Sequence, residues 1–511
     1  MKSRQKLVFI GLDGMSWELT NKLIELGIFK NIGYMKSTGC HGKMLSTKPP
    51  VTPSAWASFA TGKKPENTGI YEFILPKEKF GDGSFVSTKN INGKTFYESL
   101  TDSNYKCILI NLPLSYPPRI KKTIVTSILS RGSNIIFPQE LLEKYPIFKK
   151  YKIKADTKFA NLKKYSAFIE ELRAVERTRF EVGKTLFTKE SWDFFFIHFF
   201  STDTLMHELY HILIKKDLRG KEKKLQEQAF EFFRDIDSYV GWFMNKLECA
   251  ILFVLSDHGF KQYEGLFFAN TWLKKQGYLS YAYAVGNNKK IFSNKIIDMV
   301  GYFDNKIFNK ILSAIYGMAK TFFGITYQAS NNISPKSQAY CLRKRGIYLN
   351  KAGYYAEGVL NNEEYFSLRK KLLKELKDLK GPDNKRAFKA VLTKEQIYGK
   401  NPINIAPDIY IDADKLDVIY HNSPHIFNTN ITVNEHADYG IFLAYGTNVK
   451  KMQKDVAIWD FAPTILDWYG IKSAGQQFDG KSLDIFQSMP SKNKNSLEKI
   501  KLNFSINDLK V

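Results

Sequence analysis

The stretch AILFVLSDHG, residues 250–259, joins an apolar run directly to Asp257 and His258. A short, nearly continuous apolar run is typical of a strand that is buried on both faces of a parallel sheet. Open α/β sheets place their chemistry at the carboxyl ends of such strands. The adjacent carboxylate and imidazole therefore indicate either a metal site or an acid–base pair, and the stretch alone leaves both interpretations open.

Similar apolar runs recur along the chain and alternate with stretches of helical spacing. Strands are expected at 7–12, 107–112, 192–199, 250–255, 346–350, 408–412 and 439–445. Helices are expected at 17–26, 165–188, 204–215, 222–247, 362–379 and 460–469. This alternation predicts an α/β fold with a doubly wound, mostly parallel central sheet and helices on both of its faces.

The composition changes after about residue 275, where lysine, asparagine and phenylalanine become frequent. This change predicts an insertion into the core sheet. The expected parts are a first catalytic segment at 1–275, an inserted cap subdomain at 276–400, a closing catalytic segment at 401–487 and a lysine-rich tail at 488–511. Within the insertion, residues 306–323 form a basic amphipathic stretch, which either packs against its own domain or lies on a membrane surface.

Charge is the second global feature of the chain. Its 511 residues include 76 basic and 51 acidic side chains, which gives a net charge of +25. Such a charge attracts anionic partners, either phosphorylated substrates or an anionic membrane or polyanion surface. The lysines are scattered over many segments, so a lysine-rich composition without a dedicated surface is the alternative. The sequence contains no motif specific for nucleic acid.

The cysteines and the N-terminus bear on the compartment. The four cysteines are far apart and show no CxxC spacing: Cys40, Cys107, Cys249 and Cys341. This pattern is typical of small core residues in a reducing compartment. The first apolar run is shorter than the apolar region of a signal peptide, and no apolar stretch is long enough for a transmembrane helix. We therefore expect a cytoplasmic protein.

Three further places deliver Asp or His next to a predicted strand. Asp13 follows the strand at 7–12, Asp203 follows the strand at 192–199, and His436 precedes the strand at 439–445. His207 stands four residues after Asp203, so a helix would place both on one face, close enough to share an ion. His211 continues that face and is the obvious false candidate. Together these carboxylates and imidazoles suit zinc, or manganese in a more oxygen-rich site.

The segment KPPVTPSAW, residues 48–56, contains the candidate nucleophile Thr52. Its prolines prevent a helix before Thr52, and Ser54 is expected to cap a helix that runs from Ala55 to Gly62. Thr52 would then face a helix N-terminus, which suits a phosphoryl oxygen. A metal ion could activate the hydroxyl, since no neighbouring His or Lys could deprotonate it. The alternative is a proline-rich turn with a structural hydroxyl.

With these residues in order, the chain resembles the type I phosphodiesterase/nucleotide pyrophosphatase-like members of the alkaline phosphatase superfamily. The matching pieces are residues 8–14, 50–62, 201–207, 256–259, 436–440, 460–466 and 479–483. The resemblance implies an alkaline phosphatase-like fold and two divalent metal ions, zinc or manganese. One ion would be held by Asp13, Thr52, Asp257 and His258, and the other by Asp203, His207 and His436. It also implies that Thr52 attacks phosphorus and forms a phosphothreonine that water then hydrolyses.

The implied activity is that of a phosphoric diester hydrolase acting on a phosphorylated small molecule or a phosphodiester. Nucleotide pyrophosphatases carry an asparagine three residues after their threonine, where this chain has Ala55. The oxyanion contact is then expected from Ser54, the backbone or a lysine, so Ser54 and Ala55 are the candidate substrate contacts. Tyr354 replaces an arginine that the family commonly carries after a glycine, and Thr68 replaces a frequent histidine.

Other functions remain open on the same residues. A phosphomonoesterase or a phospho-group transferase would share the metal ligands and the nucleophile. A catalytically degenerate relative could instead bind an anionic ligand through its positive charge. A sulfatase is disfavoured, because the segment after Thr52 lacks both the Cys or Ser and the arginine that such enzymes need.

Overall fold

The computed structural model describes residues 5–130, 134–247, 250–281, 333–399, 405–471 and 477–487. Cys249, the amphipathic stretch 306–323 and the tail from residue 488 lie outside these ranges. The three cysteines within them are buried and unpaired, as predicted. Among the described residues, no helix is long and apolar enough to cross a membrane.

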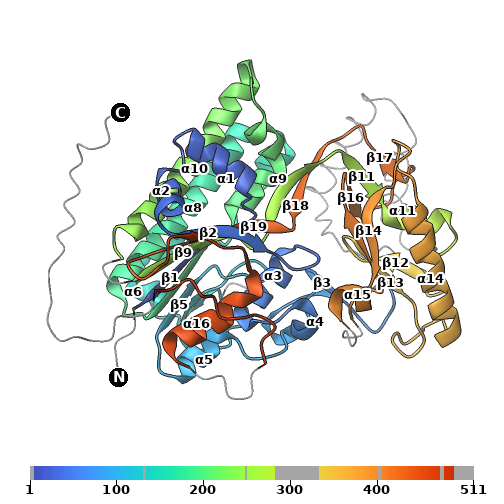
Figure 1. Ribbon diagram of the computed structural model, residues 1–511, viewed down its shortest axis with the longest axis horizontal. Helices are drawn as coiled ribbons and strands as arrows, with labels where there is room; N and C mark the ends of the chain where they lie inside the picture. Colours follow the sequence, from blue (N-terminus) through green and yellow to red (C-terminus); the bar gives the residue numbers. More distant parts are fainter. Residues whose placement is uncertain are drawn as a thin grey trace.

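The chain forms a larger and a smaller lobe (Figure 1). Ten strands of the larger lobe form one mixed sheet with β1 near its centre, in the order β20-β2-β19-β9-β1-β8-β5-β6-β7, with β21 beside β2. The strands are β1 Leu7–Leu12, β2 Cys40–Leu45, β5 Cys107–Ile110, β6 Thr123–Val125, β7 Ile136–Phe137, β8 Phe194–Phe199, β9 Ile251–Leu255, β19 Tyr439–Tyr445, β20 Met452–Gln453 and β21 Val456–Ala457. β1 pairs in parallel with both β8 and β9, whereas β19 runs antiparallel to β9 and β2.

Helices cover both faces of this sheet (Figure 1). One face packs against α1 Trp17–Glu25, α2 Lys30–Thr38, α8 Tyr165–Lys189, α9 Ser201–Ile214 and α10 Gly220–Met244, and the other against α3 Thr52–Thr61, α5 Phe96–Asp102 and α16 Phe461–Tyr469. Shorter helices are α4 Pro65–Thr68, α6 Leu141–Lys144 and α7 Lys158–Asn161. The predicted α/β fold, with a mostly parallel central sheet covered on both faces, is confirmed.

The smaller lobe is built around a four-stranded sheet in the order β12-β13-β15-β14 and a three-stranded sheet in the order β16-β11-β17. Its elements are β11 Gly265–Phe268, α11 Ala269–Lys275, β12 Ala339–Cys341, β13 Gly346–Leu349, α14 Asn362–Asp378, β14 Phe388–Thr393, α15 Lys394–Tyr398, β15 Ile409–Ala413, β16 Leu416–Ile419 and β17 Phe427–Asn428. A short hairpin of β3 Ile74–Pro76 and β4 Gly83–Phe85 reaches it from the larger lobe. The lobe extends past both ends of the predicted insertion 276–400, because β11 pairs with β16 and β13 pairs with β15.

A two-stranded ribbon links the two lobes and shapes the site between them. It consists of β10 Gly259–Tyr263 and β18 Val433–Ala437, which pair antiparallel with Phe260 opposite His436. β10 begins directly after His258, so the ribbon brings the end of β9 next to a segment that is almost 180 residues further along the chain. Parallel pairing of β1 with β8 and β9 brings three strand ends to the same edge of the sheet.

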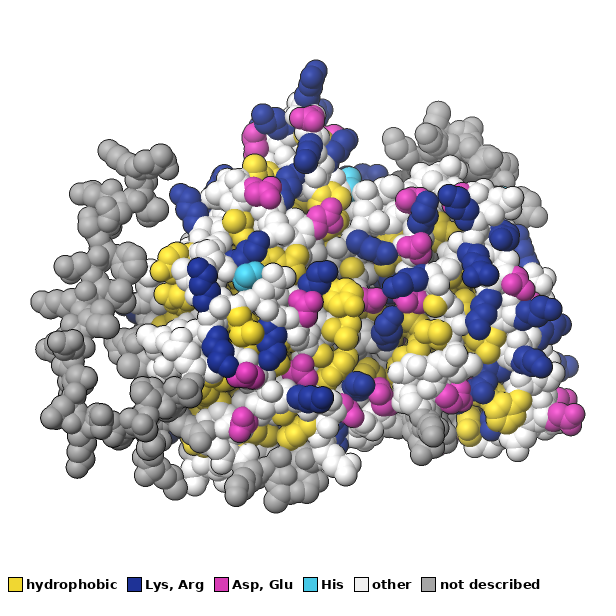
Figure 2. Space-filling model, in the orientation of Figure 1, with side chains coloured by type: hydrophobic (Ala, Val, Ile, Leu, Met, Phe, Trp, Pro, Cys, Tyr) yellow, Lys and Arg dark blue, Asp and Glu magenta, His cyan; other side chains and the backbone are white. Residues whose placement is uncertain are grey.

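Basic side chains are spread over the surface of both lobes. On the face shown in Figure 2, lysines and arginines alternate with acidic side chains and do not gather over one element. Several of the lysines belong to surface ion pairs, such as Lys144 with Glu190. A dedicated anionic partner surface therefore stays a prediction from the net charge.

Candidate metal centre and nucleophile

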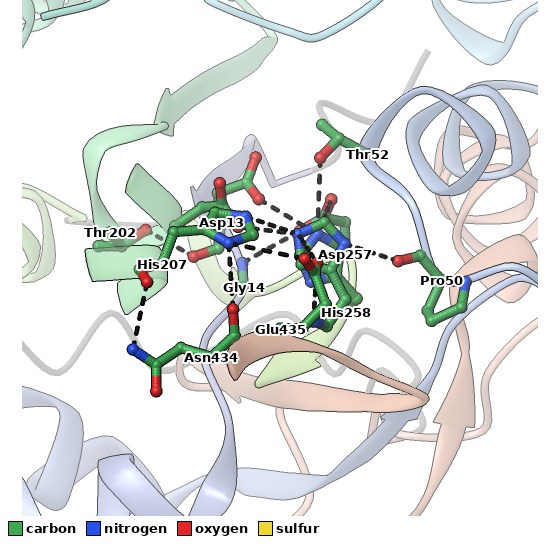
Figure 3. A network of polar contacts seen from close by, with 12 residues as sticks. Asp13, Gly14, Pro50, Thr52, Thr202, His207, Asp257, His258, Asn434 and Glu435 are labelled. Carbon is green, nitrogen blue, oxygen red and sulfur yellow. Dashed lines mark hydrogen bonds and ion pairs between the residues drawn. The ribbon is translucent and has the colours of Figure 1, made fainter. Parts of the chain in front are cut away.

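Thr52 and the ligands that follow β1 and β9 meet at one ring nitrogen (Figure 3). The Nε2 atom of His258 lies 3.3 Å from Asp257 Oδ2 and 3.5 Å from Asp13 Oδ1. The hydroxyl of Thr52 lies 3.5 Å from the same nitrogen. All four side chains are buried. The structure thus brings together the four residues that the family resemblance assigned to one metal ion.

The second predicted group also converges. His207 Nε2 lies 3.1 Å from His436 Nε2, and Asp203 Oδ1 lies 3.4 Å and 3.2 Å from these two nitrogens. Asp203 and His207 lie one turn apart on α9, as their spacing predicted. His211, a further turn along, contacts the side chain of Asn434 instead and does not join the group.

The three imidazoles are oriented by backbone carbonyl groups. The contacts are His207 Nδ1 to Asn434 O at 3.3 Å, His436 Nδ1 to Pro50 O at 2.9 Å and His258 Nδ1 to Gly259 O at 3.1 Å. A proton on each Nδ1 satisfies these carbonyl groups and leaves each Nε2 with a free lone pair. The Nε2 lone pairs then point at carboxylate oxygens, which are also acceptors. A metal ion between them, or a proton on Nε2, removes this repulsion, and an outer carbonyl on Nδ1 is common for metal-bound histidine.

The donor atoms fit a metal ion in number, type and spacing. Each group offers three atoms from Asp and His that lie within 4.8 Å of one another. Tetrahedral zinc with bonds of about 2.0–2.2 Å places its ligand atoms roughly 3.3–3.6 Å apart, and the separations from the imidazole Nε2 atoms run from 3.1 to 3.5 Å. Asp13, Asp203 and Asp257 each have a buried carboxylate oxygen without a hydrogen-bond partner among the described residues. The chain therefore contains two sites that a divalent ion would complete.

The two groups hold protons differently when no cation is bound. Burial, followed by the charge of Asp257, raises the pKa of Asp13 well above its ordinary value, and burial raises the pKa of Asp257 to about 7. Burial also opposes ionisation of Asp203, but His207 and His436 outweigh it and hold its pKa well below 3.8. The pKa of His207 rises to about 9, because Asp203 outweighs the effect of burial. Metal binding at either group must therefore release protons.

Thr52 is the first residue of α3, so it lies where the helix leaves amides without intrahelical acceptors. The predicted cap at Ser54 is wrong: Val51 precedes the helix, and Ser54 lies in its first turn. The reason is Pro53, which occupies a first-turn position where its missing N–H costs no hydrogen bond. The Ser54 hydroxyl donates to Ile70 O at 2.7 Å, and the amide of Ala55 donates to Val51 O.

Sequence reasoning missed His198, which lies behind Asp13 on β8. Its Nε2 lies 3.0 Å from Asp13 Oδ2, and both side chains are fully buried. The ring packs edge-on against Trp56, with centroids 4.9 Å apart. A Cβ at Gly11 would lie 2.6 Å from the ring, so the neighbouring strand leaves room only for glycine. The available signal was a single polar residue inside the apolar strand FFFIHF.

The smaller lobe contributes two cations that sequence reasoning also missed. Lys344 forms an ion pair with Glu435, the residue before the ligand His436. Arg345 is buried and donates to His436 O at 3.3 Å. Lys344 holds the pKa of Glu435 well below its ordinary value against the opposing effect of burial. The basic run at 343–345 was the available signal, but its sequence does not reveal which carboxylate it meets.

The family model for type I phosphodiesterase/nucleotide pyrophosphatase matches residues 7–437 of the chain. The chain belongs to this family. It is therefore a phosphohydrolase of the nucleotide pyrophosphatase/phosphodiesterase type, from a metal-dependent group of phosphoesterases. The family match spans both ligand groups, Thr52 and most of the smaller lobe.

Solved structures show the same fold at low sequence identity. Murine ectonucleotide pyrophosphatase/phosphodiesterase 5 gives a TM-score of 0.52 at 12% identity, over 93% of this chain and 97% of that one. An inactive threonine-to-alanine form of the murine protein, in complex with AMP, gives 0.51 at 13% identity over 93% and 97%. Phosphonoacetate hydrolase from Sinorhizobium meliloti 1021, in complex with phosphonoformate, gives 0.53 at 13% over 92% and 96%. Comparison with curated protein sequences gave no match.

Proposed function

We propose that the protein is a two-metal phosphodiesterase or nucleotide pyrophosphatase that uses Thr52 as its nucleophile. The observation that carries the proposal is the position of the Thr52 hydroxyl, 3.5 Å from His258 Nε2 and at the first turn of α3. A degenerate binding protein has no need to keep six converging Asp and His side chains and a nucleophile. Zinc is the proposed metal because each group mixes imidazole nitrogen with carboxylate oxygen, and manganese is the alternative.

The proposed reaction has two displacements at phosphorus. Thr52 Oγ forms a bond to phosphorus, the bond from phosphorus to the leaving oxygen breaks, and the leaving group departs with a proton. Water then attacks the phosphothreonine, the Oγ–P bond breaks, and the Thr52 hydroxyl is restored. When bound, the two metal ions would lower the pKa of the hydroxyl and neutralise the charge on the phosphoryl oxygens.

The protein's own contribution is to position the phosphoryl group. Pro50 O holds the ring of His436, and Pro49 and Pro50 precede Thr52 in a constrained turn. The first-turn amide of Ser54 is available to a phosphoryl oxygen at the helix N-terminus. We propose that Ser54 contributes this backbone amide and not its side chain, because its hydroxyl donates to Ile70 O. Ala55 would then contribute only its buried methyl group to the surroundings of the phosphoryl group.

A nucleotide ester is the proposed substrate class. The family includes nucleotide pyrophosphatases by description, and the murine relative was solved with AMP after loss of its threonine. That relative supports a role for a threonine in catalysis. We propose that Thr52 has the same role in this chain.

The test compares Thr52→Ala and Thr52→Ser with the native protein on bis-p-nitrophenyl phosphate, with zinc or manganese added. Loss of the nucleophile should lower kcat by at least about 10³-fold, whereas serine should retain measurable turnover. Metal analysis should find about two ions per chain in the native protein, and circular dichroism should show that the variants are folded. Native-like turnover by a folded Thr52→Ala protein would remove Thr52 from the mechanism.

A further inference from the structure

A small hollow lies between the two lobes. Its wall is formed by Pro49, Tyr71, Glu72, Leu342, Arg343, Lys344, Gly346, Tyr348 and Pro407. Pro49 belongs to the turn that leads into Thr52. Lys344 pairs with Glu435, which adjoins the ligand His436. Two residues of the wall therefore belong to, or contact, segments that carry candidate site residues.

Glu72 is the unusual residue of this wall. It is 5% exposed, and its Oε1 atom accepts a hydrogen bond from the amide of Phe73 at 2.9 Å. The same oxygen lies 3.6 Å from Arg343 Nε. Its other oxygen, Oε2, has no hydrogen-bond partner among the described residues. A buried carboxylate oxygen without a partner is unfavourable, so this atom indicates a ligand that donates a hydrogen bond.

The size and charge of the hollow narrow the chemistry of that donor. The hollow has a volume of about 10 Å³, which admits one water-sized group and no ring or phosphate. A water molecule, a hydroxyl or an amino group would fit. Arg343 and Lys344 both line the hollow and would repel an ammonium group. A neutral donor, either a water molecule or a hydroxyl of the substrate, therefore matches Glu72.

We propose that Glu72, held by Arg343, accepts a hydrogen bond from a hydroxyl of the organic group esterified to the phosphate. The substrate is then a phosphodiester of a polyol, with ribose and glycerol as the two sources of the hydroxyl. A carboxylate that accepts from a sugar hydroxyl is a common form of ribose recognition. This inference rests on the proposed function, because it assigns a specificity subsite to the same centre.

The test uses p-nitrophenyl phosphodiesters whose second alcohol is the 5′-hydroxyl of adenosine, glycerol or ethanol. Only the first two present a free hydroxyl, and they distinguish ribose from glycerol. In Glu72→Ala, the preference in kcat/KM for a hydroxyl-bearing ester over the ethyl ester should fall about 10- to 100-fold. Glu72→Gln retains an acceptor oxygen and should lose less. Glu78→Ala, at an exposed glutamate nearby, is the matched control.

The ratio of the kcat/KM values for two esters, measured on the same variant, does not depend on the fraction of that variant that is folded. An unchanged ratio in Glu72→Ala would overturn the subsite, as would a native enzyme that does not prefer hydroxyl-bearing esters. A crystal structure of metal-loaded protein with AMP that shows only an ordered water at Glu72 would also overturn it for ribose.

A second set of measurements distinguishes failure of the proposed function from failure of the Glu72 subsite. If the native protein hydrolyses none of the three esters, the phosphodiesterase proposal fails. Calorimetric binding of AMP, glycerol 3-phosphate and ethyl phosphate then tests the subsite alone. The subsite would be supported if AMP or glycerol 3-phosphate binds more tightly than ethyl phosphate and this difference is lost in Glu72→Ala. Equal binding of all three ligands would refute it.

Discussion

Replacement of His198 by phenylalanine tests whether the imidazole behind Asp13 holds that carboxylate in place for a metal ion. The two side chains are fully buried, and His198 Nε2 lies 3.0 Å from Asp13 Oδ2. Outer partners of metal ligands typically change metal affinity by about 10- to 100-fold. We expect a loss within this range for the ion held by Asp13.

The assay is a zinc titration of chelator-stripped protein in competition with a chromophoric chelator, so that the two equivalents are resolved. His198→Phe should weaken one equivalent and leave the other close to its native constant. His198→Gln keeps an N–H group that can reach Asp13 and should recover part of the affinity. His425→Phe, at an exposed histidine, controls for the loss of an imidazole elsewhere.

Packing must be separated from metal positioning, because His198 also contacts Trp56. Urea denaturation of the metal-free proteins measures this effect directly. A purely structural role would lower the free energy of unfolding and leave both zinc constants unchanged. Native zinc constants in folded His198→Phe would refute the positioning role, and so would equal weakening of both equivalents.

Three other perturbations have directions that the structure determines. In metal-free protein the pKa of His207 is raised from an ordinary 6.5 to about 9, so the charged imidazole stabilises the fold. This stabilisation is complete below pH 6.5 and is lost as the pH rises to 9. The melting temperature should therefore fall over this window, and it should fall less in His207→Asn. Ser54→Ala should lower the free energy of unfolding by about 1–3 kcal/mol, measured in urea, because a buried carbonyl loses its donor. Arg345→Met should cost about 3–5 kcal/mol in the same measurement, because Asp417 is left buried without its cation; a native-like unfolding midpoint would contradict either estimate.

The candidate ligands could be found from the sequence because their positions follow local rules. Asp13 and Asp257 follow apolar strands, and Asp203 and His207 have helical spacing. The prediction that Ser54 caps the helix was wrong because a proline is tolerated inside the first turn. The helix therefore includes Pro53 and begins at Thr52. His198 and Lys344 were missed for a different reason. Their partners lie far away in the chain, and no local pattern records which carboxylate a buried cation or imidazole will meet.

The bounds of the smaller lobe illustrate the same limit on a larger scale. Residues from 401 onwards were predicted to return to the core sheet, and the strand at 408–412 was correctly recognised. Its pairing partner is β13 of the smaller lobe, and the next strand pairs with β11. Strand propensity is local, whereas the choice of partner depends on register and burial across the whole fold.

The smaller lobe does more than cover the site, because it braces the second ligand group. Arg345 and the hydroxyl of Tyr263 both donate to the carbonyl of His436, at 3.3 and 3.0 Å. The ring of His436 stacks on that of His258 with centroids 3.7 Å apart, which joins the two ligand groups. Lys344 compensates the buried charge of Glu435 beside them. The position of His436, and with it the second ligand group, therefore depends on contacts from Arg345 and Lys344 of the smaller lobe.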